Sequence, residues 1–145
     1  MRIGGRIAVA AALTLVAAAC RGGGGETTVD VTLQEFSVNP ARSSAPAGTV
    51  TFHIRNQGPN DPHEFVVIRT DLAPDALPTD ERGVVDESAQ GIEVVDEVEE
   101  IPVGGSATLS VDLDPGNYVL ICNIYDAEEQ EAHYSQGMRT AFTVE

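Results

Sequence analysis

The sequence predicts an all-β fold, an antiparallel β-sandwich, and three observations support this. Short runs of alternating apolar and polar residues recur along the chain, as at residues 29–36 and 49–56, and such alternation is typical of strands with one buried face. Clusters of Gly, Pro, Asn and Asp separate the runs, which indicates turns. The pattern of a long helix is absent. Several short strands with regular turn signals favour two packed sheets.

The individual strands follow from the same pattern. In residues 49–56, the apolar side chains of Val50, Phe52 and Ile54 occupy one face. Residues 63–70 are apolar and β-branched, and residues 118–122 form a continuous apolar run, as expected of well-buried strands. The predicted strands are residues 29–36, 49–56, 63–70, 106–113, 118–122 and 138–144.

Residues 71–105 do not have a single interpretation. Residues 71–83 contain turn residues and room for one helical turn. Residues 91–105 favour either another strand or an amphipathic cover on one sheet. The predicted fold therefore includes a short helix or irregular insert.

The first 19 residues predict a secretory signal peptide rather than part of the fold. Arg2 and Arg6 give a positive start, and residues 7–18 form an apolar run followed by small residues. This run is shorter than the about 20 apolar residues that a transmembrane helix needs. The domain that follows is therefore expected outside the cytoplasm.

Cys20 follows directly after the predicted signal peptide. Residues 16–20, Val-Ala-Ala-Ala-Cys, resemble a bacterial lipobox, although Ala17 stands where Leu is usual. The resemblance implies that Cys20 is lipidated and anchors the protein to the bacterial cell membrane, with residues 20–26 as a Gly-rich tether and 27–145 as the domain. Ordinary cleavage after Ala19, which gives a periplasmic or secreted protein, is the alternative.

The composition is strongly acidic. The formal net charge is −15 and the chain contains no Lys, so binding to nucleic acid is excluded for want of a basic surface. An acidic surface attracts cationic partners, although solubility alone would also explain the charge.

Four side chains form a candidate metal site. Copper favours a Cys thiolate with two imidazoles and a weak thioether, and the chain after Cys20 offers Cys122, His63, His133 and Met138 for these roles. They lie at the ends of predicted strands or in the loop before the last strand, where they can converge at one end of a sandwich. In an oxidising compartment, an unpaired Cys122 thiol is also expected to bind an ion, unless it forms a disulfide with Cys20.

The segments around these residues resemble the cupredoxins, the plastocyanin- and azurin-like blue copper proteins. "LDPGNYVLICNI", "HYSQGM" and "AFTV" are similar to that family's C-terminal signature, and "NQGPNDPHEFVV" to its first-His segment. The resemblance implies a Greek-key antiparallel β-sandwich, cupredoxin-like, with one type 1 copper ion per chain. It implies strong ligands at His63, Cys122 and His133, a long axial ligand at Met138, and supporting residues next to the ligands. These supporting residues are Asn123, beside the thiolate, and Glu64.

The sequence departs from the family between Cys122 and His133, where close relatives often have a shorter loop. The spacer contains four acids, Asp126, Glu128, Glu129 and Glu131. Asp126 and Glu129 are spaced as in a capping box, and Ala, Glu and Gln favour helices. We therefore expect residues 126–131 to form a turn or two of helix that bulges outward and returns His133 to the site.

The predicted function is one-electron transfer by a monomeric, extracytoplasmic blue copper protein. By resemblance, the exposed edge of His133 would be the electron port, and a basic, cytochrome-like redox partner is expected. An enzyme such as a nitrite reductase would need a second copper, for which only His53 remains, and this residue is predicted to face solvent. A copper-handling module without redox turnover and a metal-free binding domain are the alternatives.

Overall fold

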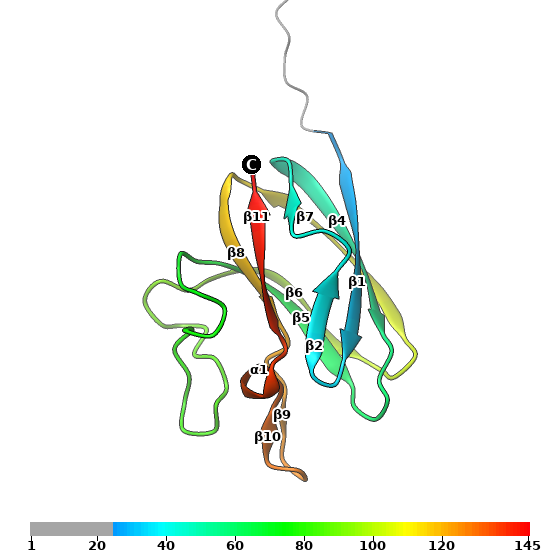
Figure 1. Cartoon of the computed structure of the whole chain (residues 1–145), viewed down its shortest axis with the longest axis vertical. Helices are drawn as coiled ribbons and strands as arrows, with labels where there is room; N and C mark the ends of the chain where they lie inside the picture. The colour runs from blue at the N-terminus through cyan, green and yellow to red at the C-terminus, as the bar shows by residue number, and fades with distance from the viewer. Residues whose placement is uncertain (1–24) are drawn as a thin grey trace, which may run out of the picture.

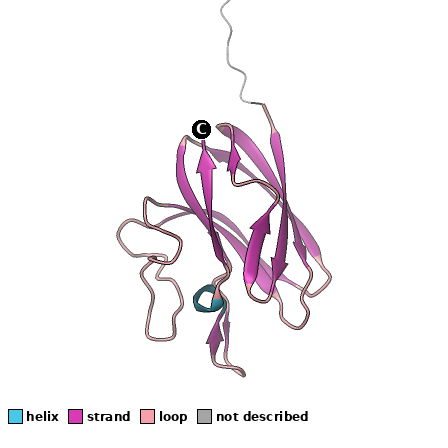
Figure 2. Cartoon of the chain, in the orientation of Figure 1, coloured by secondary structure: helices cyan, strands magenta, loops and turns pink. Residues whose placement is uncertain are grey.

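The computed structural model describes residues 25–145, and two β-sheets packed face to face make up most of this region (Figure 1). The predicted signal peptide, Cys20 and most of the tether lie outside the described residues. Strands dominate the picture, with one short helix (Figure 2). Within residues 25–145, no helix is long and apolar enough to cross a membrane.

The first sheet contains four strands in the order β2-β1-β4-β7. Strand β1 pairs antiparallel with β2 and parallel with β4, and β4 pairs antiparallel with β7. The alternation read from the sequence directs every second side chain of β1 and β4 inward. The strands span Thr27–Gln34 (β1), Ser37–Pro40 (β2), Gly48–Asn56 (β4) and Ser106–Leu113 (β7).

The second sheet contains five strands in the order β3-β11-β8-β5-β6. Strands β8 and β5 lie at its centre, which explains why their sequences are almost continuously apolar. The strands span Ser44–Ala45 (β3), His63–Arg69 (β5), Glu93–Ile101 (β6), Gly116–Ile121 (β8) and Arg139–Val144 (β11).

The core lies between the two sheets and contains three phenylalanines in contact. The ring of Phe52 lies 5.2 Å from that of Phe65 and 5.6 Å from that of Phe142, centroid to centroid. All three are at most 1% exposed, and burial of each such side chain contributes about 1.5–3 kcal/mol. The sandwich is therefore a rigid frame for the loops at its ends.

The predicted all-β sandwich is confirmed, with one correction. The sheets are mixed rather than wholly antiparallel, because β4 pairs parallel with β1 and β11 pairs parallel with β3. The six predicted strands form, and residues 91–105 contain strand β6, the first of the two predicted alternatives. Strands β2 and β3 lie between the predicted strands at 29–36 and 49–56, where no strand was predicted.

The expected helix at residues 126–131 is wrong. The chain forms a hairpin there, β9 (Tyr125–Asp126) and β10 (Glu131–Ala132). Asp126 caps the intervening turn, accepting backbone N–H bonds from Glu128 and Glu129, as a capping residue does. Gln130 has a positive φ of 58°, which ends any helical run. The single helical turn of the described region, α1 (His133–Gln136), follows the hairpin.

The loops that carry chemistry gather at one end of the sandwich. The β1–β2 turn, the end of β8, the β9–β10 hairpin and α1 lie at the lower end in Figure 1, while the start of β1 and the C-terminus lie at the other.

Candidate metal centre

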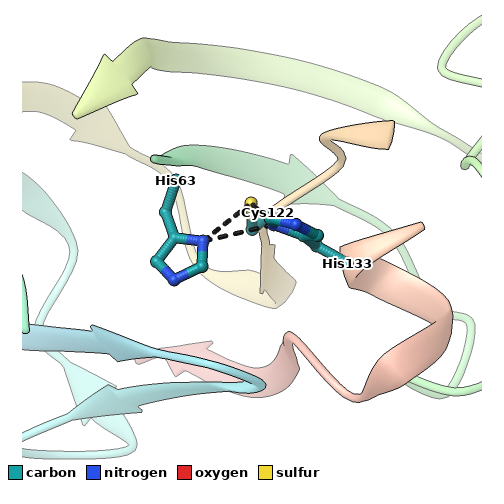
Figure 3. A group of neighbouring side chains, drawn as sticks. All are labelled: His63, Cys122 and His133. Atoms are coloured by element: carbon teal, nitrogen blue, oxygen red, sulfur yellow. Dashed lines mark hydrogen bonds between the residues drawn. The ribbon is translucent and has the colours of Figure 1, made fainter. Parts of the chain in front are cut away.

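Three side chains that are distant in sequence meet at this end of the sandwich. The Sγ of Cys122 lies 3.5 Å from Nδ1 of His133 and 3.9 Å from Nδ1 of His63, and the two Nδ1 atoms are 3.2 Å apart. Figure 3 shows both rings turned toward the sulfur. One donor atom from each residue lies within 4.8 Å of the others, which is close enough for a single ion.

His63 is positioned by the turn that precedes β5. The Asn56 side chain holds this turn, because its amide donates to the carbonyls of Asp61 and Ile101 at 2.9 Å each, and its oxygen accepts from the N–H of Gly58 at 2.7 Å. His63 then opens a strand at the centre of the sheet and is fully buried.

Cys122 directly follows strand β8 and is also fully buried. Its backbone N–H donates to the carbonyl of Met138 at 3.1 Å, which fixes the strand end against the segment before β11. Its Sγ accepts a bond from the backbone N–H of Glu64 at 3.3 Å. Burial raises the pKa of the thiol to about 12, so a metal ion must displace a proton to bind the sulfur.

His133 begins helix α1, at the point where the hairpin ends. Its backbone N–H donates to the carbonyl of Ile124 at 2.9 Å, and its carbonyl accepts from the N–H of Met138 at 3.0 Å. The first bond closes the long spacer at its base, and the second spans helix α1. The extra residues are therefore accommodated in the projecting hairpin, and His133 stays beside Cys122.

Both imidazoles are held in the neutral form that binds metals. Burial, together with the neighbouring His133, lowers the pKa of His63 to about 4, although Glu35 opposes the shift. Burial also lowers the pKa of His133, against the opposing charge of Asp61. Two neutral imidazoles and one buried sulfur form a donor set consistent with one type 1 copper ion.

Asn123 and Glu64 lie next to Cys122, and their supporting role stays a prediction. A Glu64 carboxylate oxygen accepts the Asn123 N–H at 2.7 Å. The Asn123 side chain accepts from the N–H of Val85 and donates to its carbonyl, at 2.7 and 3.1 Å, and so fastens residues 71–92 to the site. Burial raises the pKa of Glu64 to about 7.

Met138 is fully buried and adjoins Cys122 through the backbone. Both residues belong to the same buried core cluster, while the role of Met138 as axial ligand stays a prediction. His53 lies elsewhere, on β4, with a side chain 53% exposed beside Asp30. It faces solvent as predicted.

The expected exposure of His133 is wrong, because its ring is only 1% exposed. Phe36 covers it edge-on at 5.4 Å between centroids, and Asp61 lies 4.0 Å from its Nε2. Glu35 similarly lies 3.7 Å from Nε2 of His63. The sequence analysis missed Glu35, Phe36 and Asp61. Asp61 stands two residues before His63, and this proximity was the one available signal.

Comparisons with known proteins identify the family and the fold. Residues 6–132 match the family model of the cupredoxin-like domain. A search of curated proteins gives no match.

Among solved structures, a reduced auracyanin from the photosynthetic bacterium Roseiflexus castenholzii is 22% identical, over 82% of this chain and 97% of that one, with a TM-score of 0.56. Auracyanin A, a "blue" copper protein from Chloroflexus aurantiacus, is 16% identical, over 83% and 100%, also with a TM-score of 0.56. Rusticyanin from Thiobacillus ferrooxidans is 19% identical, over 85% and 79%, with a TM-score of 0.60. At these identities the structural matches show a shared fold.

Proposed function

Because the chain belongs to the family of cupredoxin-like domains, we propose that it is a type 1 copper protein that carries single electrons outside the cytoplasm. The observation that carries the proposal is the buried cluster of His63, Cys122 and His133. These residues would be the three strong ligands, and Met138 the long axial one. The solved blue copper protein of similar fold, auracyanin A, supports the choice of metal.

The donor set suits copper better than other ions. Zinc accepts a thiolate and two imidazoles but gains little from a thioether, whereas a thioether suits copper. A copper ion bound here would supply a one-electron couple. The chain holds the donors on a rigid β frame, excludes water by burying all three, and directs the Glu64 N–H at the sulfur.

Electron carriage fits the burial better than copper delivery does. His63 and Cys122 are 0% exposed and His133 is 1% exposed, so a receiving protein could not reach a donor atom without opening the site. A second copper, as a nitrite reductase type of enzyme needs, would lack ligands because His53 lies apart from the cluster. The chain is therefore proposed to be a carrier and not an enzyme.

The electron route is proposed to pass through the covered edge of His133. A hollow of about 260 Å³ lies over this end of the molecule, lined by Glu35, Phe36, Asn60, Asp61, Glu129 and Glu131. Four of these six residues are acids, so the surface favours a basic redox partner such as a cytochrome. The chain is expected to act as a monomer, and association with the partner should slow as salt screens the charges.

Anchorage to the membrane is a separate proposal that rests on the sequence pattern at residues 16–20. Cleavage would remove residues 1–19, lipid on Cys20 would hold the chain to the membrane, and residues 20–26 would be the tether. Expression of the full chain in a bacterium should place it in the membrane fraction, and Cys20→Ala should release it. An unchanged distribution for Cys20→Ala would contradict lipid anchoring and leave the copper site unaffected.

The copper proposal is tested by adding one equivalent of Cu(II) to the purified chain. An intense blue colour is expected, since it requires a thiolate bound to Cu(II), and a mild reductant should bleach it reversibly. Cys122→Ser should abolish the colour, and His133→Ala should abolish or strongly alter it. The matched control His53→Ala should keep it. A colourless protein, or one that binds copper equally well without Cys122, would contradict the proposal.

A further inference from the structure

We propose that Glu35 and Asp61 are positioning residues, which hold the two histidine rings through their Nε2 atoms and favour oxidised over reduced copper. This inference rests on the proposed copper site. It concerns two carboxylates on the opposite side of the rings from the sulfur, and Glu35 is the stronger case.

Each histidine ring has a carboxylate behind it. An oxygen of Glu35 lies 3.7 Å from Nε2 of His63, and an oxygen of Asp61 lies 4.0 Å from Nε2 of His133. Both Nε2 atoms are buried and make no hydrogen bond within the described part of the chain. Buried polar atoms are seldom left unpaired, so both nitrogens are poised for a partner.

The state of the other ring nitrogen identifies that partner. The Nδ1 atoms of both rings face the sulfur (Figure 3), and a ring that binds a metal through Nδ1 carries its proton on Nε2. Each Nε2 is then a donor and needs an acceptor. The Oε1 atom of Glu35 is the oxygen that lies 3.7 Å from Nε2 of His63. The Oε2 atom of the same carboxyl group is buried and makes no hydrogen bond of its own among residues 25–145, so this carboxyl group retains a free acceptor.

Glu35 is held in place by the loop that precedes His63. Its Oε1 accepts backbone N–H bonds from Asn60 at 3.0 Å and Asp61 at 2.6 Å, and its own N–H donates to the carbonyl of Gly58 at 3.4 Å. The side chain is only 8% exposed. A carboxylate fixed in this way can orient a ring, as such partners do at other metal sites.

The charge of these carboxylates acts differently on the two oxidation states. A negative charge stabilises a doubly charged ion more than a singly charged one, and burial reduces the screening of that charge by solvent. Glu35 therefore favours Cu(II) over Cu(I). Asp61, with a side chain 25% exposed, acts in the same direction and less strongly.

The test compares Glu35→Gln and Asp61→Asn with a matched control, Glu129→Gln, in the copper-loaded full chain. Gln at position 35 keeps an oxygen for the two backbone donors and removes only the charge. Glu129 lines the same hollow and forms no hydrogen bond or ion pair with either histidine in the described structure, so its substitution removes an equal charge without a positioning role. Affinities for Cu(II) and Cu(I) are measured by competition, and the reduction potential by spectroelectrochemistry.

For Glu35→Gln we expect Cu(II) affinity to fall about 10- to 100-fold, with a smaller loss for Cu(I). A tenfold difference between the two losses raises the reduction potential by about 59 mV for one electron. Asp61→Asn should shift the potential in the same direction by less, and Glu129→Gln should leave it nearly unchanged. If Glu35→Gln moves the potential no more than Glu129→Gln does, the inference is wrong, while the copper site itself stands.

A second measurement does not depend on copper. Nitrogen NMR of the metal-free wild-type chain at pH 8 should show the ring of His63 as the tautomer with its proton on Nε2. A proton on Nδ1 would overturn the positioning role of Glu35. A wild-type chain that binds no copper would instead overturn the proposed function, and the claim about oxidation states with it.

Discussion

At the scale of single residues, the protonation state of Cys122 governs metal uptake. Burial raises the pKa of the thiol to about 12, although the N–H of Glu64 opposes the shift. The thiol is therefore protonated at neutral pH, while His63, with a pKa of about 4, is already neutral. Proton release on metal binding should come from the sulfur alone.

We expect the wild-type chain to release about one proton per copper ion bound at pH 8.5. Its apparent affinity should rise roughly tenfold per pH unit between pH 8 and 10, because each ion displaces one proton. Calorimetry in two buffers that differ in ionisation enthalpy measures the release. A release close to zero would show that the thiolate exists before the metal arrives.

Glu64 is a second residue whose charge is costly in the folded state. Burial raises its pKa from 4.5 to about 7, so between pH 4.5 and 7 the folded chain carries a proton on Glu64 that the unfolded chain has released. The contribution of this proton to the free energy of unfolding is thus present at low pH and is lost as pH rises from 4.5 to 7. The lowered pKa of His63 acts oppositely, since its effect removes stability as pH falls from 6.5 to 4.

Glu64→Gln should therefore stabilise the metal-free chain at pH 8 by about 1–2 kcal/mol, after allowance for solvent screening. The gain should shrink as pH falls from 7 to 4.5 and vanish below that. Urea unfolding of both chains at pH 4.5 and pH 8 measures the difference. An equal gain at the two pH values would show that charge is not the cause.

At the scale of elements, the β9–β10 hairpin adds length to the ligand loop without altering its base. The bond from the His133 N–H to the Ile124 carbonyl closes the loop before the hairpin projects. Replacing residues 127–130 with Asn-Gly, which favours a tight hairpin turn, should leave the copper colour unchanged. It should change the free energy of unfolding by less than about 1 kcal/mol. Loss of colour on this replacement would show that the hairpin itself positions His133.

Helix α1 joins the metal end of the molecule to the long segment 71–92. The hydroxyl of Tyr134 donates to the carbonyl of Pro74 at 2.7 Å and accepts the N–H of Leu77 at 3.1 Å. Leu77 is buried with the Tyr134 ring in a small second core. Residues 71–92 are therefore fastened to the site on one side by Tyr134 and on the other by Asn123.

Tyr134→Phe should destabilise the chain by about 1–3 kcal/mol, because the buried N–H of Leu77 loses its partner. Denaturant unfolding measures the loss. Tyr118→Phe is a suitable comparison, since the Tyr118 hydroxyl makes a single hydrogen bond within residues 25–145, to the carbonyl of Asp114 at 2.8 Å. A smaller loss for Tyr134→Phe than for Tyr118→Phe would contradict the double role of the Tyr134 hydroxyl.

Strands that alternate or lie at the centre of a sheet were predictable, because burial of one or both faces leaves a pattern along the chain. β4 and β8 are examples. Strands β2 and β3 were not, because each is short and is defined by its partner strand. The hairpin at 125–132 was also missed, since local helix propensity is weak beside strand pairing and a turn at Gln130.

The meeting of His63, Cys122 and His133 could be anticipated because few residue types suit copper and each occurs rarely in this chain. The carboxylates behind the rings could not be anticipated in the same way. Glu35 lies 28 positions before His63 in the sequence, and only the fold brings the two side chains together. The chain also contains many other acidic residues, and nothing in the sequence distinguishes Glu35 from them.

At the scale of the whole molecule, the two ends of the sandwich differ in kind. The first described residues and the C-terminus lie at one end, and the candidate metal centre lies at the other (Figure 1). An attachment made ahead of residue 25 thus leaves the histidine-bearing end unobstructed. If the chain is bonded to a gold electrode through a thiol added at its N-terminus, the candidate metal centre should face the solution, where a dissolved cationic mediator can reach it. If it is bonded through a thiol placed on the 127–130 turn, the candidate metal centre should instead face the electrode.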